Sequence, residues 1–391
     1  MPTSLTTARS RLAPVPAAPW TARLATYALF AANGIVYGTW IGLLPRLREV
    51  AGLDDQELGV VLLAVSLGAV AAMPLIGQLA ARVGTGRICL GAALGLGVVL
   101  PLPGLATGYA TLIAAAALLG VLFGTLDVSM NAHATRVEQQ WGAAIMSSFH
   151  GVWSTAGLAG AAVMGLLLSR GWALPACYAV GGIGCALLGL AALWAERGIA
   201  HDVAASKAKS GPRFRLPGRA LAGVCVMAAL SFTMEGGISD WAGVYLRVVL
   251  GASVARATIA YQAFAFAMAI CRFAGDVVVR RLGPVTVLRF GGLLTIAGVG
   301  LGLMMRTPVA AAATFALAGV GLANVIPVVF SAAGRKGGSP GVAMVATMGY
   351  AGLLGGPPLI GFVAQHAGLG TALGLVTVGA VVLIAIARTA E

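Results

Sequence analysis

The sequence predicts an all-α membrane protein with twelve transmembrane helices, arranged as two six-helix halves related by a pseudo-two-fold axis. Of its 391 residues, 59% are hydrophobic and only 9% are charged, whereas a soluble domain carries roughly 25% charged residues. Long uncharged runs separate the charges, and a helix of about 20 residues is enough to cross a hydrocarbon layer of about 30 Å. In addition, sequence motifs recur between the two halves of the chain.

The uncharged runs define the predicted spans. Their apolar residues are continuous and do not alternate with a period of two, which indicates helices and not barrel strands. The run from Ile88 to Leu126 has 39 residues, too many for one span, and Pro101, Pro103 and Gly108 divide it into a helical hairpin. The predicted spans are 22–45, 58–80, 86–104, 109–133, 143–169, 173–195, 220–246, 256–279, 284–305, 308–333, 340–364 and 369–388.

These spans divide the chain into two halves, residues 1–195 and residues 220–391, joined by a cytoplasmic linker at 196–219. The linker is the only sizeable hydrophilic segment, and it contains Lys207, Lys209, Arg213 and Arg215. The other loops are short, so no soluble catalytic domain has room to form.

Motifs that recur at offsets of 196 to 202 residues indicate an internal duplication. A duplicated set of six spans is what a transporter with two rocking halves requires. The matched pairs are Phe30 and Asn33-Gly34 with Phe232 and Glu235-Gly236; Gly77, Arg82 and Gly84 with Asp276, Arg281 and Gly283; Gly120-Val121 and Arg136 with Gly319-Val320 and Arg335; and Gly160-Ala161 and Gly165 with Gly356-Pro357 and Gly361.

The net charge of +13 reports membrane topology and not nucleic-acid binding. With a cytoplasmic N-terminus, eighteen of the 25 Lys and Arg lie at inner ends and loops, six lie at outer ends, and Arg272 lies within a span. This positive-inside bias places both termini in the cytoplasm. We therefore expect a monomeric, multi-pass protein of the bacterial cytoplasmic (inner) membrane, which contacts the lipid bilayer and no nucleic acid. Residues 1–19 lack the apolar core of a cleavable signal peptide.

No cofactor, metal site or enzymatic activity is predicted. The five cysteines lie in apolar segments without metal-ligand spacing, as small core residues do. The segment Gly84-Thr85-Gly86-Arg87 lacks the Lys-Ser/Thr of a phosphate-binding loop. No Ser-His-Asp arrangement can be placed on the sequence.

One cytoplasmic loop resembles a motif of the major facilitator superfamily, and the resemblance extends over essentially the whole chain. Gly77 to Arg87 is similar to the family's G-x-L-A-D-R-x-G-R loop between the second and third helices, with Ala81 in place of the acid. An acid appears in the second half instead, as Asp276. The resemblance implies a secondary transporter that moves a small solute.

Within that superfamily the chain is most similar to the fucose-permease branch and its uncharacterised bacterial relatives. Asp127-Val-Ser-Met-Asn131 resembles the E-x-x-x-N of that branch, while Ser148-Phe-His150-Gly-Val-Trp153 and Glu235-Gly-Gly-Ile-Ser-Asp240-Trp241 look like the uncharacterised relatives. Sugar symporters of the branch also use an acid in the first helix, where this chain has Asn33.

Asp127 and Glu235 are predicted to couple transport to protons, because both acids fall near the middle of a span. Asp127 precedes Arg136 by nine residues, or about 14 Å at the helical rise. Polar groups inside a bilayer are costly, and an acid at this depth suits cyclic binding and release of protons. Alternatively, Asp127 could only hydrogen-bond a neighbouring helix, and Glu235 could pair permanently with a basic group.

Further side chains are predicted to line a substrate cavity between the two halves. His150 could relay protons or be a packed hydrogen-bonding residue, and Asp240 could contact substrate or act as a gate or interface anchor. Tyr37 could equally be a packing aromatic. The predicted cavity residues are Asn33, Tyr37, Asn131, His150, Asp240, Gln262 and Asn324.

A cytoplasmic gate is predicted from charged residues at the inner ends of the helices. Arg272 and Asp276 are one helical turn apart, so they could form a local ion pair that neutralises both, or a gate that breaks in the conformational switch. The predicted gate residues are Arg82, Arg87, Arg272, Asp276 and Arg280.

These features predict proton-coupled symport of a small polar solute, sugars included, by alternating access. The alternative is a proton-driven exporter of drugs or metabolites, in which mid-membrane acids meet cations in a larger apolar pocket. Against export, Gly160-Ala161 lacks the proline of the Gly-Pro signature that drug exporters of the superfamily carry in the fifth helix. A membrane receptor or membrane-embedded enzyme is disfavoured by the lack of a sensor domain or catalytic constellation.

Overall fold

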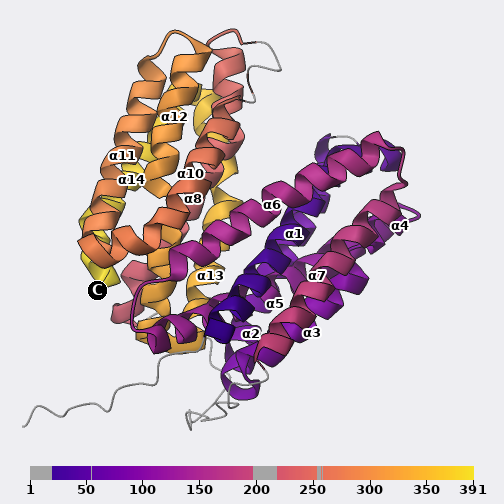
Figure 1. Ribbon diagram of the computed structural model, residues 1–391. Helices are drawn as coiled ribbons and strands as arrows, with labels where there is room; N and C mark the ends of the chain where they lie inside the picture. Colours follow the sequence, from indigo (N-terminus) through magenta and orange to yellow (C-terminus); the bar gives the residue numbers. More distant parts are fainter. Residues whose placement is uncertain (1–19, 54, 197–217, 253–256, 258) are drawn as a thin grey trace, which may run out of the picture.

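The computed structural model describes residues 20–53, 55–196, 218–252, 257 and 259–391, and they form two helical bundles that diverge towards one end (Figure 1). The predicted linker lies mostly outside the described residues. The helices are α1 (Trp20–Ala51), α2 (Asp55–Val83), α3 (Thr85–Val99), α4 (Leu102–Leu105), α5 (Tyr109–Trp141), α6 (Met146–Ser169), α7 (Leu174–Glu196), α8 (Arg219–Val248), α10 (Ile259–Leu282), α11 (Pro284–Met304), α12 (Pro308–Leu322), α13 (Val325–Ala367), α14 (Leu369–Ile386) and the 3₁₀-helix η1 (Ala387–Ala390).

Eleven helical runs within the described residues are long and apolar enough to cross a membrane. One of them, Pro308–Ala367, has 60 residues, which is about 90 Å of helix at the usual rise, three times the bilayer core. Gly338 interrupts this run with φ 56° and ψ −151°, a backbone conformation that glycine adopts readily. Division of the run at Gly338 gives the twelve crossings that the sequence predicts. The tenth crossing is itself broken at Asn324, between α12 and α13.

The two halves repeat one packing scheme, which confirms the duplicated fold. In the first half α1 packs against α6, α2 against α5, and α3 against α7. In the second half α8 packs against α13, α10 against α12, and α11 against α14. Numbered within each half, the first crossing packs against the fifth, the second against the fourth, and the third against the sixth. The same three pairings occur in both halves.

Small residues allow the helices of each half to approach closely, as expected where lipid supplies no hydrophobic drive for association. A Cβ atom added to Gly38 of α1 would collide with the carbonyl oxygen of Gly157 in α6. At the corresponding crossing of the second half, a Cβ on Gly352 of α13 would collide with the carbonyl oxygen of Ala229 in α8.

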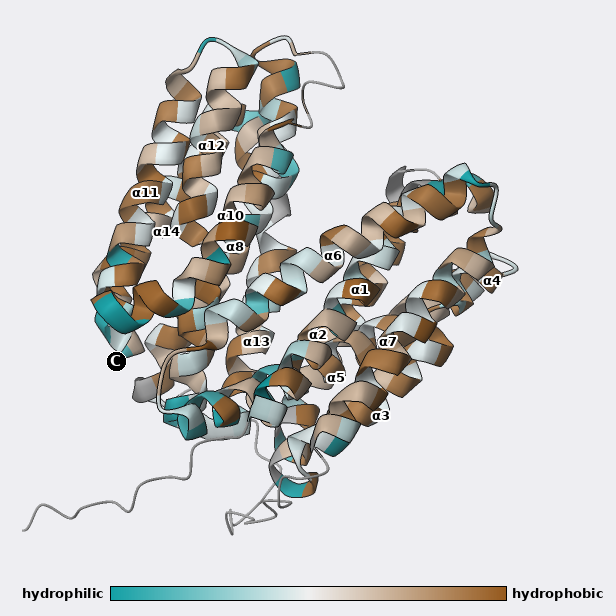
Figure 2. Ribbon diagram, viewed as in Figure 1, coloured by the Kyte–Doolittle hydropathy of each residue, from teal (hydrophilic) through white to brown (hydrophobic). Residues whose placement is uncertain are grey.

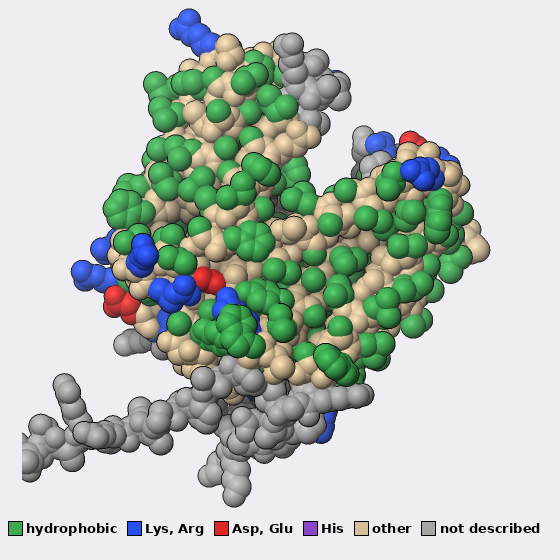
Figure 3. All heavy atoms as spheres, in the orientation of Figure 1, with side chains coloured by type: hydrophobic (Ala, Val, Ile, Leu, Met, Phe, Trp, Pro, Cys, Tyr) green, Lys and Arg blue, Asp and Glu red, His purple; other side chains and the backbone are tan. Residues whose placement is uncertain are grey.

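The outer surface is apolar along the helices and charged at their ends (Figures 2 and 3). Large apolar side chains such as Val98, Leu187 and Phe266 are 72%, 60% and 65% exposed, as a surface in contact with lipid requires. Both α1 and α8 begin, and η1 ends, at the same end of the molecule, which we call the terminal end.

Gly38→Ala is expected to destabilise the first half by about 1–3 kcal/mol, because the methyl group overpacks the contact with α6. Gly165→Ala is the matched control, since a Cβ atom there meets nothing within 4 Å. Thermal unfolding in detergent can be followed with a thiol-reactive dye, because four of the five cysteines are buried. Equal melting temperatures for the two variants would contradict the close crossing.

Candidate functional site

A cavity of about 330 Å³ lies between the two halves, within the range of about 300–1,000 Å³ that small-molecule sites occupy. Its walls come from α1, α2, α5 and α6 of the first half and from α8, α10 and α13 of the second. Phe30 and its counterpart Phe232 both line it, as do Asp127 and its counterpart Ile326. The cavity therefore includes equivalent positions of the internal repeat.

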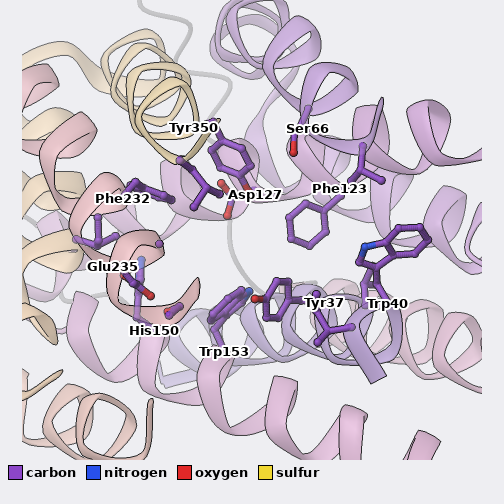
Figure 4. Close-up of a pocket in the computed structure, with 18 of the residues that line it drawn as sticks. Tyr37, Trp40, Ser66, Phe123, Asp127, His150, Trp153, Phe232, Glu235 and Tyr350 are labelled. Carbon is purple, nitrogen blue, oxygen red and sulfur yellow. The ribbon is translucent and has the colours of Figure 1, made fainter. Parts of the chain in front are cut away.

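Aromatic rings form much of the cavity wall (Figure 4). The rings of Tyr37 and Trp153 are 5.1 Å apart, and Tyr350 lies beside Asp127 (Figure 4). Trp153 is held in place by Asn33, whose Oδ1 accepts a hydrogen bond of 2.7 Å from the indole Nε1. The other aromatic residues of the lining are Phe30, Trp40, Phe123, Phe232 and Phe330.

Asp127 enters the cavity from α5 without a basic partner. Its Oδ1 lies 3.4 Å from Nδ2 of Asn131, which also donates to the Asp127 carbonyl at 2.9 Å. Within the described part of the chain, no Lys, Arg or His lies within ion-pair distance of this carboxylate. Asp127 is thus an acid of the cavity wall whose charge no side chain balances.

Glu235 of α8, by contrast, has a basic partner. Its Oε2 lies 3.6 Å from Nη2 of Arg272 in α10, and Arg272 is only 4% exposed. The same guanidinium donates from Nη1 to Oγ of Ser154 at 2.7 Å and from Nε to the Ala323 carbonyl at 3.2 Å. Because Ser154 belongs to the first half, Arg272 connects a cavity acid to the opposite half.

Asp276, one turn beyond Arg272, forms a different contact between the halves. Its Oδ1 accepts a hydrogen bond of 3.0 Å from the backbone N–H of Ser148, the third residue of α6. Its Oδ2 lies 3.8 Å from Nη2 of Arg23 in α1. A carboxylate at a helix N-terminus satisfies a free N–H group and favours the helix dipole. We call Asp276, Ser148 and Arg23 the α6 latch.

The local ion pair between Arg272 and Asp276, one of the two sequence interpretations, is therefore wrong. The two side chains leave α10 towards different partners, since Arg272 contacts Glu235 and Ser154 while Asp276 contacts Ser148 and Arg23. Side chains on consecutive turns of one helix can contact different helices when two other helices pack against it.

Further contacts between the halves lie at the terminal end. Arg280 donates to the Ala144 carbonyl at 2.8 Å, and Arg136 donates to Oγ of Ser339 at 3.3 Å. Together with the α6 latch they close this end, whereas the molecule is hollowed between its halves at the opposite end (Figure 3). The other two predicted gate residues, Arg82 and Arg87, are exposed on either side of the turn between α2 and α3.

The predicted cavity residues divide into two groups. Asn33, Asn131 and Asn324 are buried outside the lining, Asn324 donating from Nδ2 to the Cys271 carbonyl at 3.4 Å, and Gln262 is exposed near the start of α10. These four side chains do not line the cavity. The residues that do line it are Tyr37, His150 and Asp240.

Sequence reasoning missed several residues of the site. Trp153 stands in the Ser148–Trp153 motif and could have been noticed there, whereas nothing in the sequence distinguishes Tyr350. Arg23 lies at the start of the first predicted span, where a basic residue indicates only the orientation of the helix in the membrane. Ser154 is a small residue among many.

Comparison with known proteins identifies the family. The family model described as Major Facilitator Superfamily matches residues 26–340. An uncharacterised MFS-type transporter of Yersinia pestis is 36% identical over 376 residues, covering 94% of this chain and 95% of that protein. The membrane protein MosC of Rhizobium meliloti is 30% identical over 360 residues, covering 91% of this chain and 87% of that protein.

Solved structures share the fold at low sequence identity. FucP in the outward conformation superposes with a TM-score of 0.77 at 17% identity, covering 94% of this chain and 98% of that chain. The proton:xylose symporter XylE gives a TM-score of 0.74 at 13% identity, covering 94% of each chain.

Asn33→Ala is expected to destabilise the protein by about 1 kcal/mol, because the N–H of the half-buried Trp153 loses its acceptor. In a Trp153→Phe background the same substitution should cost less, since that background has no N–H to satisfy. Unfolding of the four proteins of this double-mutant cycle measures the coupling. Equal costs in both backgrounds would show that the hydrogen bond does not hold the ring.

Proposed function

The chain belongs to the major facilitator superfamily, and on that premise we propose that it is a proton-coupled secondary transporter that moves a small polar solute by alternating access. As a member of that family it is a multi-pass membrane transporter and not an enzyme. The positive-inside bias of the sequence supports a cytoplasmic position for the terminal end, in a bacterial inner membrane. In that orientation the α6 latch is a closed cytoplasmic gate, and the cavity opens to the outside.

One observation carries the proton coupling: Asp127 lines the cavity with no basic partner in the described part of the chain. An unpaired acid inside a membrane protein is costly and functional by default. Proton binding at this position changes the charge of the cavity wall. It can drive transport because it shifts the relative free energies of the outward and inward states.

Arg272 supports a second step that links the cavity to the gate. Protonation of Glu235, or contact of its carboxylate with solute, weakens its interaction with the Arg272 guanidinium. Arg272 also holds Ser154 of the other half, so a change at Glu235 reaches the interface between halves. In this proposal Glu235 is the second proton-responsive residue, and Asp276 releases α6 when the cytoplasmic side opens.

A second candidate function, export of drugs or metabolites, is favoured by the aromatic wall and the acids of the cavity, which suit apolar cations. Cells that express an exporter gain resistance to such compounds and accumulate less of a cationic dye. Substrate-driven uptake of protons into proteoliposomes supports the symporter instead.

Asp127→Asn is expected to abolish solute-triggered proton entry into proteoliposomes, because an amide cannot bind and release a proton at neutral pH. The measurement is internal acidification after addition of a panel of polar solutes, with a pH-sensitive dye inside the vesicles. Asp127→Glu retains an acid and should retain proton entry at reduced rate. Full proton-linked uptake by Asp127→Asn would refute the assignment of this residue.

Asp276→Asn is expected to raise the population that is open at the terminal end about fivefold, because the lost charge is worth about 1 kcal/mol at a helix N-terminus. Spin labels at Val83→Cys and Leu282→Cys, the last residues of α2 and α10, report the distance between the halves, with Cys271→Ser included to avoid labelling there. Lys336→Gln, an exposed charge at the same end, is the control. An unchanged distance distribution would show that the latch does not hold this end closed.

A further inference from the structure

The charges of the cavity wall do not balance. Three acids line it, Asp127, Glu235 and Asp240, against one guanidinium, that of Arg272. Glu235 and Arg272 neutralise each other at 3.6 Å. Asp127 and Asp240 have no ion pair within the described residues. A cleft with charge of one sign and walls of low dielectric concentrates ligands of the opposite sign.

The aromatic residues of the wall attract the same kind of ligand. The face of an aromatic ring draws a cation within about 6 Å of its centre, by about 0.5–2 kcal/mol depending on desolvation. Tyr37 and Trp153 form one adjacent pair at the cavity, and Phe123 and Tyr350 lie across from them, on the side of Asp127 (Figure 4). An anion would meet both the acids and the ring faces unfavourably.

His150 supplies an independent indication that a hydrogen-bonding group belongs in this cavity. It lines the cavity, is only 8% exposed, and its Nδ1 has no hydrogen-bond partner. Its ring lies 5.2 Å from that of Phe30 and 5.9 Å from that of Phe330. A neutral imidazole has one donor and one acceptor nitrogen, and a hydroxyl group can both donate and accept, so a hydroxyl of the solute can pair with Nδ1 in either tautomer.

We propose that the cavity selects small organic cations, namely solutes with one protonated or quaternary amine on a hydroxylated body. The proposal rests on the transport function proposed above and specifies its substrate class. Asp240 lies five residues closer than Glu235 to the open end of α8, or about 7.5 Å along the helix. It meets the amine near the cavity entrance, while Ser66, Ser239 and His150 offer hydroxyl and imidazole groups to the polar body.

The test compares solutes that share a skeleton and differ in charge. One series is glucamine, sorbitol and gluconate, and the other is choline with its uncharged carbon isostere, 3,3-dimethylbutan-1-ol. Purified protein in detergent is titrated with each, and binding is read from tryptophan fluorescence, since Trp40 and Trp153 line the cavity. We expect at least one of the two cations to bind about tenfold or more tightly than its neutral partner, a difference of about 1.4 kcal/mol, and gluconate not to bind.

Asp240→Asn is expected to reduce the preference for the cation over its neutral partner about tenfold. The matched control is Glu49→Gln, which removes an exposed acid that pairs with Arg46 at 2.9 Å outside the cavity. It should leave the preference unchanged. A loss of preference in both variants would indicate a general surface-charge effect and would overturn the assignment of Asp240.

Several results would overturn the proposal. These are equal affinity for cation and neutral partner, tighter binding of gluconate, and no binding by either cation at its solubility limit. Proton entry driven by a neutral solute and dependent on Asp127 would refute the cation selectivity while the transport function stands. Cation binding without any proton movement would do the reverse, refuting proton coupling and supporting the selectivity.

Discussion

The hydrogen bond from the Ser148 N–H to Asp276 is the contact on which this conformation depends. The first turn of a helix has free N–H groups that must find acceptors, and α6 finds two of its acceptors outside itself. Glu138 of the same half accepts from Ile145 and Met146, at 2.9 and 2.8 Å, whereas Asp276 comes from the opposite half. One half therefore completes the cap of a helix in the other, and separation of the two halves at this end leaves the Ser148 N–H without its acceptor. Contacts at this end close the space between the halves there, whereas the molecule is hollowed at the opposite end (Figure 3).

The polar contacts of α10 connect the cavity to that closure. Arg272 and Asp276 are successive turns of one helix, so a rotation or tilt of α10 moves both. Arg272 holds Glu235 in the cavity and Ser154 in the opposite half, and Asp276 holds α6. A packed helix has few alternative positions, because interiors are dense and shift between discrete arrangements. In the proposed mechanism, a change of charge at Glu235 acts on the interface through this rigid helix.

The sequence predicts the fold well because the bilayer imposes length and hydrophobicity on every crossing, and because the duplication leaves matched motifs. It also singles out Asp127, Glu235 and Asp276, since a charge inside an apolar run is conspicuous. It fails where the outcome depends on which helices converge. Asn33 and Asn131 lie one turn from the cavity residues Tyr37 and Asp127, yet both are buried outside the lining. In the sequence, Trp153 and Tyr350 look like ordinary apolar positions of their spans. Only the packing of α6 and α13 shows that both line the cavity. Ser154 and Ser148, the partners of Arg272 and Asp276 in the first half, lie more than a hundred residues away from them, beyond any local pattern.

The acids in the membrane region fall into two groups, those whose charge a neighbouring group balances and those without such a neighbour. Glu138 and Asp276 accept backbone N–H groups of α6, and Glu235 faces a guanidinium. Each of these three has a structural partner that offsets the cost of its burial. Asp127 has only the Asn131 amide, at 3.4 Å, neither Asp127 nor Asp240 has an ion pair within the described residues, and both line the same cavity. A fold that needed only stability would lose nothing by replacing both with amides. Two acids without ion-pair partners in a cavity walled by aromatic rings make sense if something positive, a proton or a cationic solute, completes the site during each transport cycle.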